Sequence, residues 1–192
     1  KLVKDLMTPR EKLITATVGT SSEECIALLQ KHRIEKLILV NPDFSLAGML
    51  TVRDLLKKIN YPNAVQDENN RLIVGAAIGV TGDYLERAQE LVHQGANLLV
   101  LDTAHAHHSN MRSALNKLKA NLNIEIMAGN IATAKAAEYL IDSGADAIKI
   151  GIGPGSICTT RVIAGIGVPQ LSAIMDCAEV AEKAGIPLIA DG

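Results

Sequence analysis

Beyond about residue 72, short runs of apolar residues alternate with longer stretches in which apolar residues recur every three or four positions. The short runs are typical of buried strands, and the longer stretches are typical of amphipathic helices. Strands are expected at 72–78, 98–101, 124–128, 147–150 and 186–190, and helices at 85–94, 110–122, 134–143 and 173–184. Several of these helices are followed by glycine, which commonly ends a helix. The alternation predicts an α/β fold with a parallel sheet.

Two architectures fit this pattern, an open doubly wound sheet and a (β/α)₈ TIM barrel. Residues capable of chemistry follow several of the expected strands, namely Asp102, Asn130, the glycine-rich segment 151–158 and Asp191. In a barrel the carboxyl ends of all strands meet at one mouth, where active sites form. We therefore expect a (β/α)₈ barrel. Because five strands cannot close an eight-stranded barrel, residues 72–192 would form part of one.

Residues 1–59 follow a different order, which predicts a separate small domain. A strand-like run at 12–17 precedes a capping-box signature at 20–24 and a helix that continues to about residue 33. A second strand at 36–40, a turn at 41–43, a short run at 47–50 and a helix at 53–59 follow. Residues 60–71 are polar and rich in residues that break regular structure, so they are expected to form a linker.

Composition narrows the class of function. The 192 residues carry a net charge of −2 and are 48% hydrophobic, which is ordinary for a globular protein. No basic run favours nucleic acid, and no apolar stretch approaches the ~18 residues of a membrane span. The sequence shows no signal-peptide pattern, so we expect a cytoplasmic protein that binds small molecules. Only 2% of the residues are aromatic, so the core must be aliphatic, as it is inside barrels.

The glycine-rich segment after the fourth expected strand carries the strongest functional signal. Gly151, Gly153 and Gly155 let the backbone approach a ligand closely, and the Ser156 hydroxyl can bind a phosphate oxygen. Cys158 follows in the same loop, where nearby amides can stabilise the nucleophilic thiolate form. The segment therefore predicts a nucleophilic cysteine beside a phosphate-binding loop.

Two other interpretations of this segment stay open from the residues alone. It can be a tight strand-to-helix connection, or a dinucleotide-binding loop of the Rossmann type. The spacing G-x-G-x-G differs from the Rossmann G-x-G-x-x-G, and no acidic strand-end residue follows about 20 positions later. The other two cysteines, Cys25 and Cys177, fall in expected helices where a small apolar side chain suffices. Three scattered cysteines predict neither a disulfide framework nor a metal-binding motif.

The residues from Gly151 to Arg161 closely resemble the catalytic cysteine loop shared by inosine-monophosphate dehydrogenases and guanosine-monophosphate reductases. The resemblance continues through 165–170, 61–64, 71–79, 101–105, 128–130 and 189–192, and so covers nearly the whole chain. Residues 1–59 resemble the second half of the CBS-domain pair that dehydrogenases insert into the barrel. The resemblance implies that the expected strands are the third to seventh of a barrel and that the chain is incomplete.

The resemblance implies that the enzyme oxidises inosine monophosphate to xanthosine monophosphate with NAD, a step of guanine nucleotide synthesis. Cys158 would attack carbon 2 of the purine and form a covalent thioimidate. Ser156 would contact the phosphate, Asp191 the ribose hydroxyls, and Gly192 the phosphate-binding turn. Thr160 would contact the purine or the attacking water.

The resemblance also implies a set of residues for the cofactor and for potassium. Asp102 would accept from the nicotinamide ribose, with Asn130 and Gly151 near the nicotinamide. The remaining cofactor-side residues would be Thr103, Ala104 and His105. Backbone carbonyls of Gly153, Gly155 and Cys158 would coordinate K⁺, which suits a hard cation. A homotetramer is the expected assembly.

Several of these assignments have plainer alternatives. Asp102 can be a helix N-cap. The chain reads His-Ala-His-His-Ser at 105–109, where the family usually has a single histidine after glycine, so the adenosine-side loop differs. A metal site at these histidines lacks a carboxylate or cysteine partner nearby in sequence, which favours solvated loop side chains. Thr51 and Asp54 resemble the T-x-x-D by which CBS modules bind an adenine or guanine nucleotide, but they can equally form a plain helix N-terminus.

Two rival functions are compatible with the same residues. Guanosine-monophosphate reductase uses the same cysteine loop to deaminate its nucleotide with NADPH. The CBS-like segment favours the dehydrogenase, because most reductases lack that insertion. A different class would be an adenine-nucleotide sensor in which residues 1–59 are the functional part. Retention of Ser156, Cys158, Thr160 and Asp191 argues against the sensor.

Overall fold

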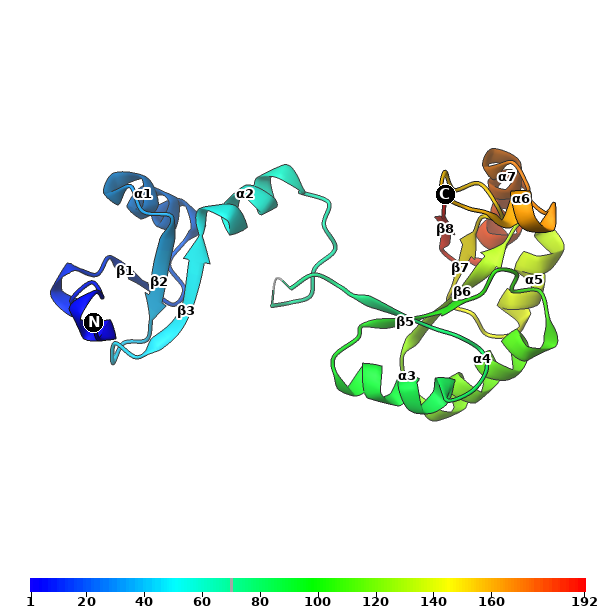
Figure 1. The fold of residues 1–192 in the computed structure, drawn as a ribbon, viewed down its shortest axis with the longest axis horizontal. Coiled ribbons are helices and arrows are strands. Elements are labelled where there is room, and N and C mark those ends of the chain that lie inside the picture. Colours follow the sequence, from blue (N-terminus) through cyan, green and yellow to red (C-terminus); the bar gives the residue numbers. More distant parts are fainter. Residues whose placement is uncertain (70) are drawn as a thin grey trace. The chain divides into compact units, whose positions relative to one another are not determined.

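The alternation of strands and helices expected beyond residue 72 is present in the computed structural model, which describes residues 1–69 and 71–192. The chain divides into two compact units, Lys1–Gln66 and Asp67–Gly192, which are called unit 1 and unit 2 below (Figure 1). The boundary falls within the segment expected as a linker, of which Asn70 lies outside the described residues.

Unit 2 is built on a parallel five-stranded sheet in the order β4-β5-β6-β7-β8. The strands are β4 (Gly75–Ile78), β5 (Leu98–Asp102), β6 (Glu125–Ile131), β7 (Ala147–Ile150) and β8 (Leu188–Ala190). The helices are α3 (Tyr84–His93), α4 (Ser109–Asn121), α5 (Ala134–Asp142), α6 (Thr160–Ala164) and α7 (Gln170–Ala184). The α/β fold with a parallel sheet is confirmed. Each strand pairs with its neighbour in sequence, without the reversal of order that marks a doubly wound sheet.

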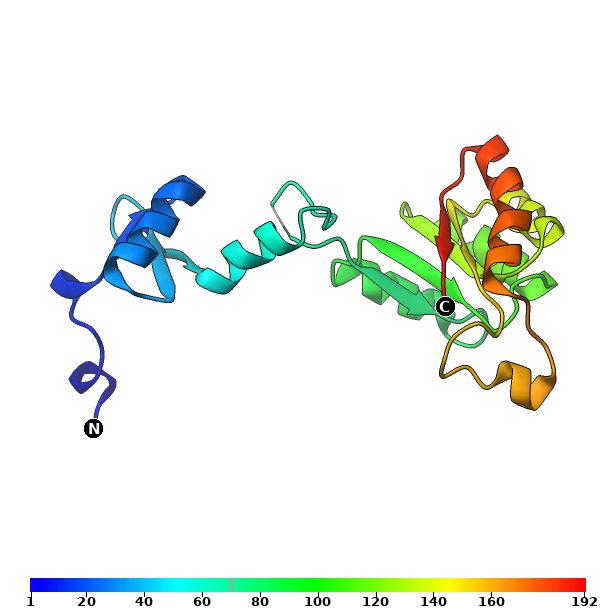
Figure 2. The same ribbon diagram turned by 90° about the horizontal axis from the view of Figure 1, so that it is seen from above.

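The helices of unit 2 pack against the sheet and against one another, α3 with α4 and α5 with α7 (Figure 2). Aliphatic side chains fill the space between, as the low aromatic content predicted. The fully buried ones include Leu99, Leu101, Leu115, Leu118, Ile126, Leu140, Ile148 and Ile150. Burial of such side chains is the main favourable contribution to folding. It fixes the ends of the strands, from which the polar side chains of the site project.

Several element boundaries of unit 2 differ from the expectation, and one helix was not predicted. The first strand begins at Gly75 and not at residue 72, because its partner β5 begins at Leu98, opposite Gly75. Helix α7 begins at Gln170, directly after Pro169, three residues before the apolar periodicity predicted. The short helix α6 was not predicted. Its five residues are too few to show a periodic pattern, and Gly165 ends it in the left-handed conformation.

Unit 1 contains a three-stranded sheet in the order β1-β2-β3, with β1 and β2 parallel and β2 and β3 antiparallel. Its elements are the 3₁₀ turns η1 (Val3–Asp5) and η2 (Arg10–Lys12), then β1 (Thr15–Thr17), α1 (Ser22–His32), β2 (Lys36–Val40), β3 (Leu46–Thr51) and α2 (Val52–Asn60). The expected β-α-β-β-α order is present. The expected strand at 12–17 is shorter than predicted, since Lys12 belongs to η2. A small core includes Ala16, Cys25, Leu29 and Leu37.

Among the residues that the structure describes, no helix has the length and apolar character needed to cross a bilayer.

Candidate functional site

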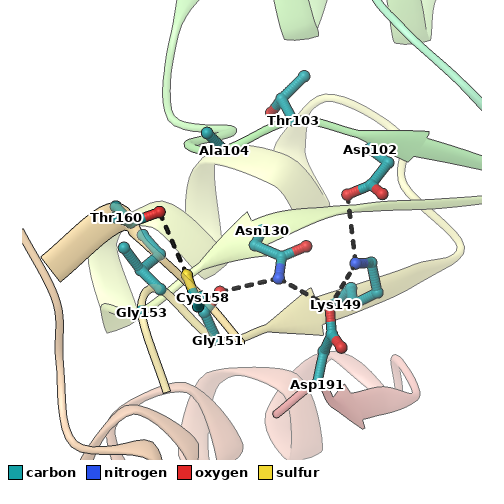
Figure 3. Close-up of a pocket in the computed structure, with 11 residues that line it drawn as sticks. Asp102, Thr103, Ala104, Asn130, Lys149, Gly151, Gly153, Cys158, Thr160 and Asp191 are labelled. Carbon is teal, nitrogen blue, oxygen red and sulfur yellow. Dashed lines mark hydrogen bonds and ion pairs between the residues drawn. The ribbon is translucent and has the colours of Figure 1, made fainter. Parts of the chain in front are cut away.

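The carboxyl ends of β5, β6, β7 and β8 meet around a cavity of about 290 Å³ in unit 2 (Figure 3). Its lining comprises Asp102, Thr103, Ala104, Asn130, Lys149, Gly151, Ile152, Gly153, Cys158, Thr160 and Asp191. The expectation that chemistry-bearing residues after successive strands converge at one edge of the sheet is therefore met. Figure 3 shows two groups of side chains, Cys158 with Thr160 and Lys149 with Asp102 and Asp191, and Asn130 lies between them.

Cys158 lies in the loop between β7 and α6, partly exposed to the cavity. Its Sγ is 3.3 Å from Oγ1 of Thr160, the first residue of α6. The Thr160 hydroxyl and backbone amide, followed by the Arg161 charge, hold the pKa of the Cys158 thiol below its usual value. A thiol with a lowered pKa is a nucleophile at a lower pH than a free cysteine.

The other two cysteines have the opposite environment. Cys177 is fully buried in α7, and burial raises the pKa of its thiol to about 11. Burial, together with the neighbouring Glu24 carboxylate, also raises the pKa of Cys25 in α1. Both serve as small core side chains, as their helical positions suggested. The geometry thus distinguishes Cys158 from the other two thiols.

Lys149 occupies the centre of a polar network that sequence reasoning missed. Its Nζ lies 2.6 Å from Oδ2 of Asp191 and 3.2 Å from Oδ1 of Asp102. Burial alone would lower the pKa of Lys149, but its hydrogen bonds and charge attraction to the two carboxylates outweigh burial and raise it. Lys149, followed by the amide of Asn130, lowers the pKa of Asp191. A signal for this residue existed, because a lysine between Ile148 and Ile150 interrupts an otherwise apolar strand.

Asn130 connects the two halves of the site. Its Nδ2 donates to the Gly151 carbonyl at 2.8 Å and to Oδ2 of Asp191 at 3.0 Å. The register between β6 and β7 shifts around Asn130. The backbone amide of Asn130 donates to the Thr103 carbonyl, and its carbonyl accepts from the Ala106 amide, both in the loop after β5. Its Oδ1 is buried and has no hydrogen-bond partner among the described residues. Most buried acceptors in proteins are paired, so this oxygen is an unusual feature of the site.

Gln170 is a second residue of the site that the sequence did not reveal in this role. From the first position of α7, its Nε2 donates to the carbonyl of Ile150 at 2.9 Å and of Asp191 at 3.3 Å. The side chain thus joins the ends of β7 and β8. Close approach also explains Gly151, which has a positive φ of 145° and no room for a Cβ against the Asp191 carbonyl.

The predicted site residues fall into two groups. Those that line the cavity are Cys158, Thr160, Asp191, Asp102, Thr103, Ala104, Asn130, Gly151 and Gly153. Ser156, Gly155, Gly192 and His105 do not line it. Ser156 is exposed on the cysteine loop, and Gly192 lies against Pro154 and Gly155 of that loop. Their roles stay predictions.

The loop histidines have positions that the sequence left open. Nδ1 of His108 accepts a hydrogen bond of 3.4 Å from the Met111 amide, so His108 is the N-cap of α4 and Asp102 is not. The His107 ring packs against Tyr139, with ring centroids 4.7 Å apart. No group of three His, Cys, Asp or Glu side chains suited to a metal ion occurs among the residues that the structure describes.

Thr51 and Asp54 lie in unit 1 and form a capping box at the start of α2. Oγ1 of Thr51 donates to Oδ2 of Asp54 at 2.6 Å, and the Asp54 amide donates to Oγ1 of Thr51 at 3.2 Å. The Thr51 hydroxyl, followed by the Thr51 amide, which donates to the same carboxylate oxygen at 3.0 Å, lowers the pKa of Asp54. The capping role is therefore observed, and nucleotide binding by the same pair stays a prediction.

Comparisons with known proteins identify the family of this chain. Residues 7–192 match the family model described as the IMP dehydrogenase / GMP reductase domain. The chain is 50% identical over 191 residues to inosine-5′-monophosphate dehydrogenase of Bacillus subtilis and 52% identical over 192 residues to that of Helicobacter pylori. These two alignments cover 99% and 100% of this chain. The chain spans only 39% of the length of each relative.

Solved structures of the same family also match this chain in fold. A Trypanosoma brucei GMP reductase in complex with guanosine 5′-triphosphate is 45% identical, with a TM-score of 0.77 over 99% of this chain and 46% of that one. The same enzyme in complex with guanosine 5′-monophosphate also matches with a TM-score of 0.77. On the sequence match and the fold together, this chain belongs to the IMP dehydrogenase / GMP reductase family.

Proposed function

We propose that the full-length protein containing this chain is an NAD-dependent oxidoreductase that converts inosine monophosphate to xanthosine monophosphate. The observation that carries the proposal is the placement of Cys158, with its lowered pKa, in one cavity with Asp102 and Asp191. A nucleophile that shares a cavity with two carboxylates, each able to bind a ribose, suits a purine nucleotide and a dinucleotide bound side by side. Relatives named inosine-5′-monophosphate dehydrogenase at about 50% identity support it.

The finer description of the fold belongs to the same proposal. Unit 2 is assigned as the third to seventh strands of a (β/α)₈ barrel, and unit 1 as the second half of a CBS pair. The unbroken order β4-β5-β6-β7-β8 supports the barrel, in which every strand lies beside its neighbour in sequence. A homotetramer and a cytoplasmic location complete the assignment, and both rest on the resemblance.

The chain's own residues can perform the covalent steps. The Cys158 thiolate forms a bond to carbon 2 of the purine, and the hydrogen on that carbon departs with its electron pair. NAD, when bound, supplies the acceptor for this hydride. Water then adds to carbon 2 and releases a proton to solvent, the carbon–sulfur bond breaks, and its electron pair returns to sulfur as the thiolate. The Thr160 hydroxyl, 3.3 Å from Sγ, stabilises the thiolate before attack and after release.

The residues on the β5 and β6 side fit a dinucleotide. Asn130 lines the cavity, where its side chain can approach a nicotinamide. Asp102 is half exposed at the edge of the cavity, where it can accept from ribose hydroxyls. Thr103, Ala104, His105 and Gly151 complete the proposed set.

The carbonyls assigned to K⁺ are chemically suited to it. Those of Gly153 and Cys158 accept no hydrogen bond from the described backbone outside regular helices and strands, so their lone pairs stay available. The Gly155 carbonyl accepts one, from the Cys158 amide at 3.0 Å, and keeps its second lone pair. A cation held by these carbonyls would fix the loop that carries Cys158.

Unit 1 is proposed to regulate and not to catalyse. Thr51 and Asp54 are the residues assigned to an adenine or guanine nucleotide, and a complex of the trypanosomal reductase with guanosine 5′-triphosphate supports nucleotide binding within the family. The cavity of about 450 Å³ in unit 1 is lined by Thr15, Ala16, Thr20, Glu24, Ala27, Leu28 and Lys31, and it includes neither proposed residue.

The second candidate is GMP reductase activity, in which NADPH drives deamination of guanosine monophosphate. The trypanosomal reductase matches 99% of this chain, including the residues of unit 1, so the presence of unit 1 does not separate the two activities. The higher identity to the named dehydrogenases favours oxidation.

Absorbance at 340 nm separates the two candidates in the full-length protein. NADH that appears with inosine monophosphate and NAD supports the dehydrogenase. NADPH consumed with guanosine monophosphate, without NADH formation in the first assay, would reverse the assignment. The Cys158→Ala variant should be inactive in either direction, because both activities need the same nucleophile.

A further inference from the structure

Lys149 joins two carboxylates that come from opposite sides of the site. Asp102 ends β5, Asp191 follows β8, and Lys149 lies on β7. Its Nζ contacts both, at 3.2 Å and 2.6 Å. Resting on the proposed function, we propose that Lys149 is a positioning residue that couples the ribose site of the nucleotide to the ribose site of the cofactor.

The sequence around Lys149 makes this bridge possible. The Lys149 side chain must extend across β6 to reach Asp102 on β5, and Gly129 is the β6 residue paired with Lys149. A Cβ at Gly129 would lie 2.7 Å from Cβ of Lys149 and 2.5 Å from its carbonyl oxygen. The absence of a side chain at Gly129 therefore provides the space that Lys149 occupies. The same strand pairing sets Asp102 opposite Gly129 on the other side.

Burial makes the Lys149 ammonium group depend on both of its carboxylate partners. The Lys149 side chain is 15% exposed, whereas those of Asp102 and Asp191 are 49% and 48% exposed. A largely buried charge is costly unless it is paired. The Lys149 ammonium group therefore depends on its two carboxylates, whereas the carboxylates are also stabilised by solvent. Movement of one carboxylate then changes the position of Lys149 and, through it, the other carboxylate.

The hydrogen-bond pattern leaves one oxygen of each carboxylate for a ligand. Oδ2 of Asp191 accepts from Lys149 and from Asn130, and Oδ1 of Asp102 pairs with Lys149. Oδ1 of Asp191 and Oδ2 of Asp102 have no hydrogen bond or ion pair among the described residues. Lys149 thus fixes one oxygen of each carboxylate and leaves the other oxygen free to accept from hydroxyl groups of a ligand.

The charge balance gives Lys149 a second effect on both sites. Two carboxylates and one ammonium group carry a net charge of −1, and removal of Lys149 would leave two unscreened negative charges. Their repulsion would displace both side chains and raise the pKa of Asp191, whose largest stabilising contact is Lys149. Binding at either ribose site should therefore depend on Lys149.

The test replaces Lys149 in the full-length protein with Met, which keeps the aliphatic chain, with Gln, which keeps a donor, and with Arg, which keeps the charge. The matched control is Lys119→Met, because Nζ of Lys119 lies 2.5 Å from Asp146 in a comparable ion pair of unit 2 whose residues do not line the cavity. We expect Lys149→Met to raise the KM of both inosine monophosphate and NAD by about 10- to 100-fold, because misplacing a binding group by ~1 Å has an effect of this size.

Lys149→Arg should retain most of the affinity for inosine monophosphate and for NAD. Lys119→Met should leave both KM values unchanged.

Coupling is measured by equilibrium binding in a Cys158→Ala background, where no adduct forms. Inosine monophosphate is titrated with and without saturating NAD. With Lys149 present, the two affinities should differ by a factor within about 5–150, the usual range for coupled sites, and this factor should approach 1 with Met or Gln. The acid limb of nucleotide binding should move to higher pH with Met and not with Arg.

The outcomes separate this proposal from the proposed function. A change in only one KM, equal changes in Lys119→Met, or a coupling factor that is unchanged by Met and Gln would each overturn the role of Lys149. If Lys149→Met unfolds, Lys149→Gln supplies the same readouts, and loss of folding in both would show a structural role instead. If the wild-type protein oxidises no inosine monophosphate, the proposed function fails, and the same titrations with guanosine monophosphate and NADPH still test the coupling.

Discussion

The Cys158 sulfur lies 3.3 Å from the Thr160 hydroxyl, two residues further along the chain. Thr160 begins α6, so the helix orients its own first hydroxyl and amide toward the thiol. Both groups favour the thiolate, and they are the largest causes of the lowered pKa of Cys158. The first residue of this five-residue helix therefore favours the thiolate form of Cys158.

Thr160→Ala should raise the pKa of Cys158, because it removes the largest stabilising contact of the thiolate. The rate of alkylation by iodoacetamide, measured against pH, should show its midpoint below the usual thiol value of 9.0 in the wild-type protein. The midpoint should move to higher pH in Thr160→Ala and much less in Thr160→Ser, which keeps the hydroxyl. Identical midpoints in all three proteins would contradict the contact.

Cys158 should be the first cysteine to react in the folded protein. Cys25 and Cys177 are buried, and burial raises the pKa of both. Mass spectrometry of peptides after brief alkylation measures the order of reaction, and inosine monophosphate should protect the Cys158 peptide. Prior reaction at Cys177, or equal labelling with and without the nucleotide, would show that the assignment is wrong.

Gly129→Ala should destabilise unit 2 by about 1–3 kcal/mol, the usual cost of overpacking. The added Cβ would collide with the Lys149 backbone, which lies in the centre of the sheet. Gly79→Ala is the matched control, because a Cβ there meets nothing within 4 Å. Urea unfolding of both variants measures the difference. Equal stability of the two variants would contradict the crowding at Gly129.

The ion pair of Asp191 should contribute stability that depends on pH. Lys149 and Asn130 lower its folded-state pKa below the ordinary value of 3.8. The contribution is therefore complete well above pH 3.8 and is lost as the pH falls through the lower folded-state pKa. The effect should be small, because Asp191 is half exposed and solvent screens the pair.

The measurement for Asp191 is urea unfolding of wild type and Asp191→Asn between pH 7 and about pH 3. The gap in unfolding free energy should stay constant from pH 7 to about pH 5 and then narrow. A gap that widens on acidification would contradict the sign of the pKa shift.

Potassium should activate turnover if the carbonyls of Gly153, Gly155 and Cys158 bind it as proposed. Rates are compared at equal ionic strength in potassium and lithium chloride, since lithium is too small for a ring of carbonyls suited to potassium. The rate should be several-fold higher in potassium. Equal rates would remove K⁺ from the proposal and leave the cysteine chemistry intact.

Sequence patterns predicted the sheet well where local and tertiary preferences agree. The strands at 98–101 and 147–150 were found within one residue of their observed ends, because continuous aliphatic runs between glycine-ended helices admit few alternatives. The convergence of Asp102, Asn130, Cys158 and Asp191 followed from the parallel arrangement of the strands.

Other features depend on contacts between distant residues, which no local pattern records. The role proposed for Lys149 depends on its contacts with Asp102 and Asp191, which lie 47 and 42 residues away in the sequence. Gln170 joins two strand ends from a helix, which its own neighbours do not indicate. His108 caps α4 although histidine is not a common N-cap residue, so sequence rules did not point to it.

The strand order of unit 2 also determines how the sheet can be assembled during synthesis. Every strand from β5 to β8 pairs with the strand made immediately before it. Within the sheet that the structure describes, no pairing has to wait for a segment that is translated much later, so loop closure stays short at each step. As each βα segment leaves the ribosome, it meets a folded edge that is already in register. The nascent sheet can therefore grow one strand at a time, and each new strand covers the edge at which aggregation would otherwise begin.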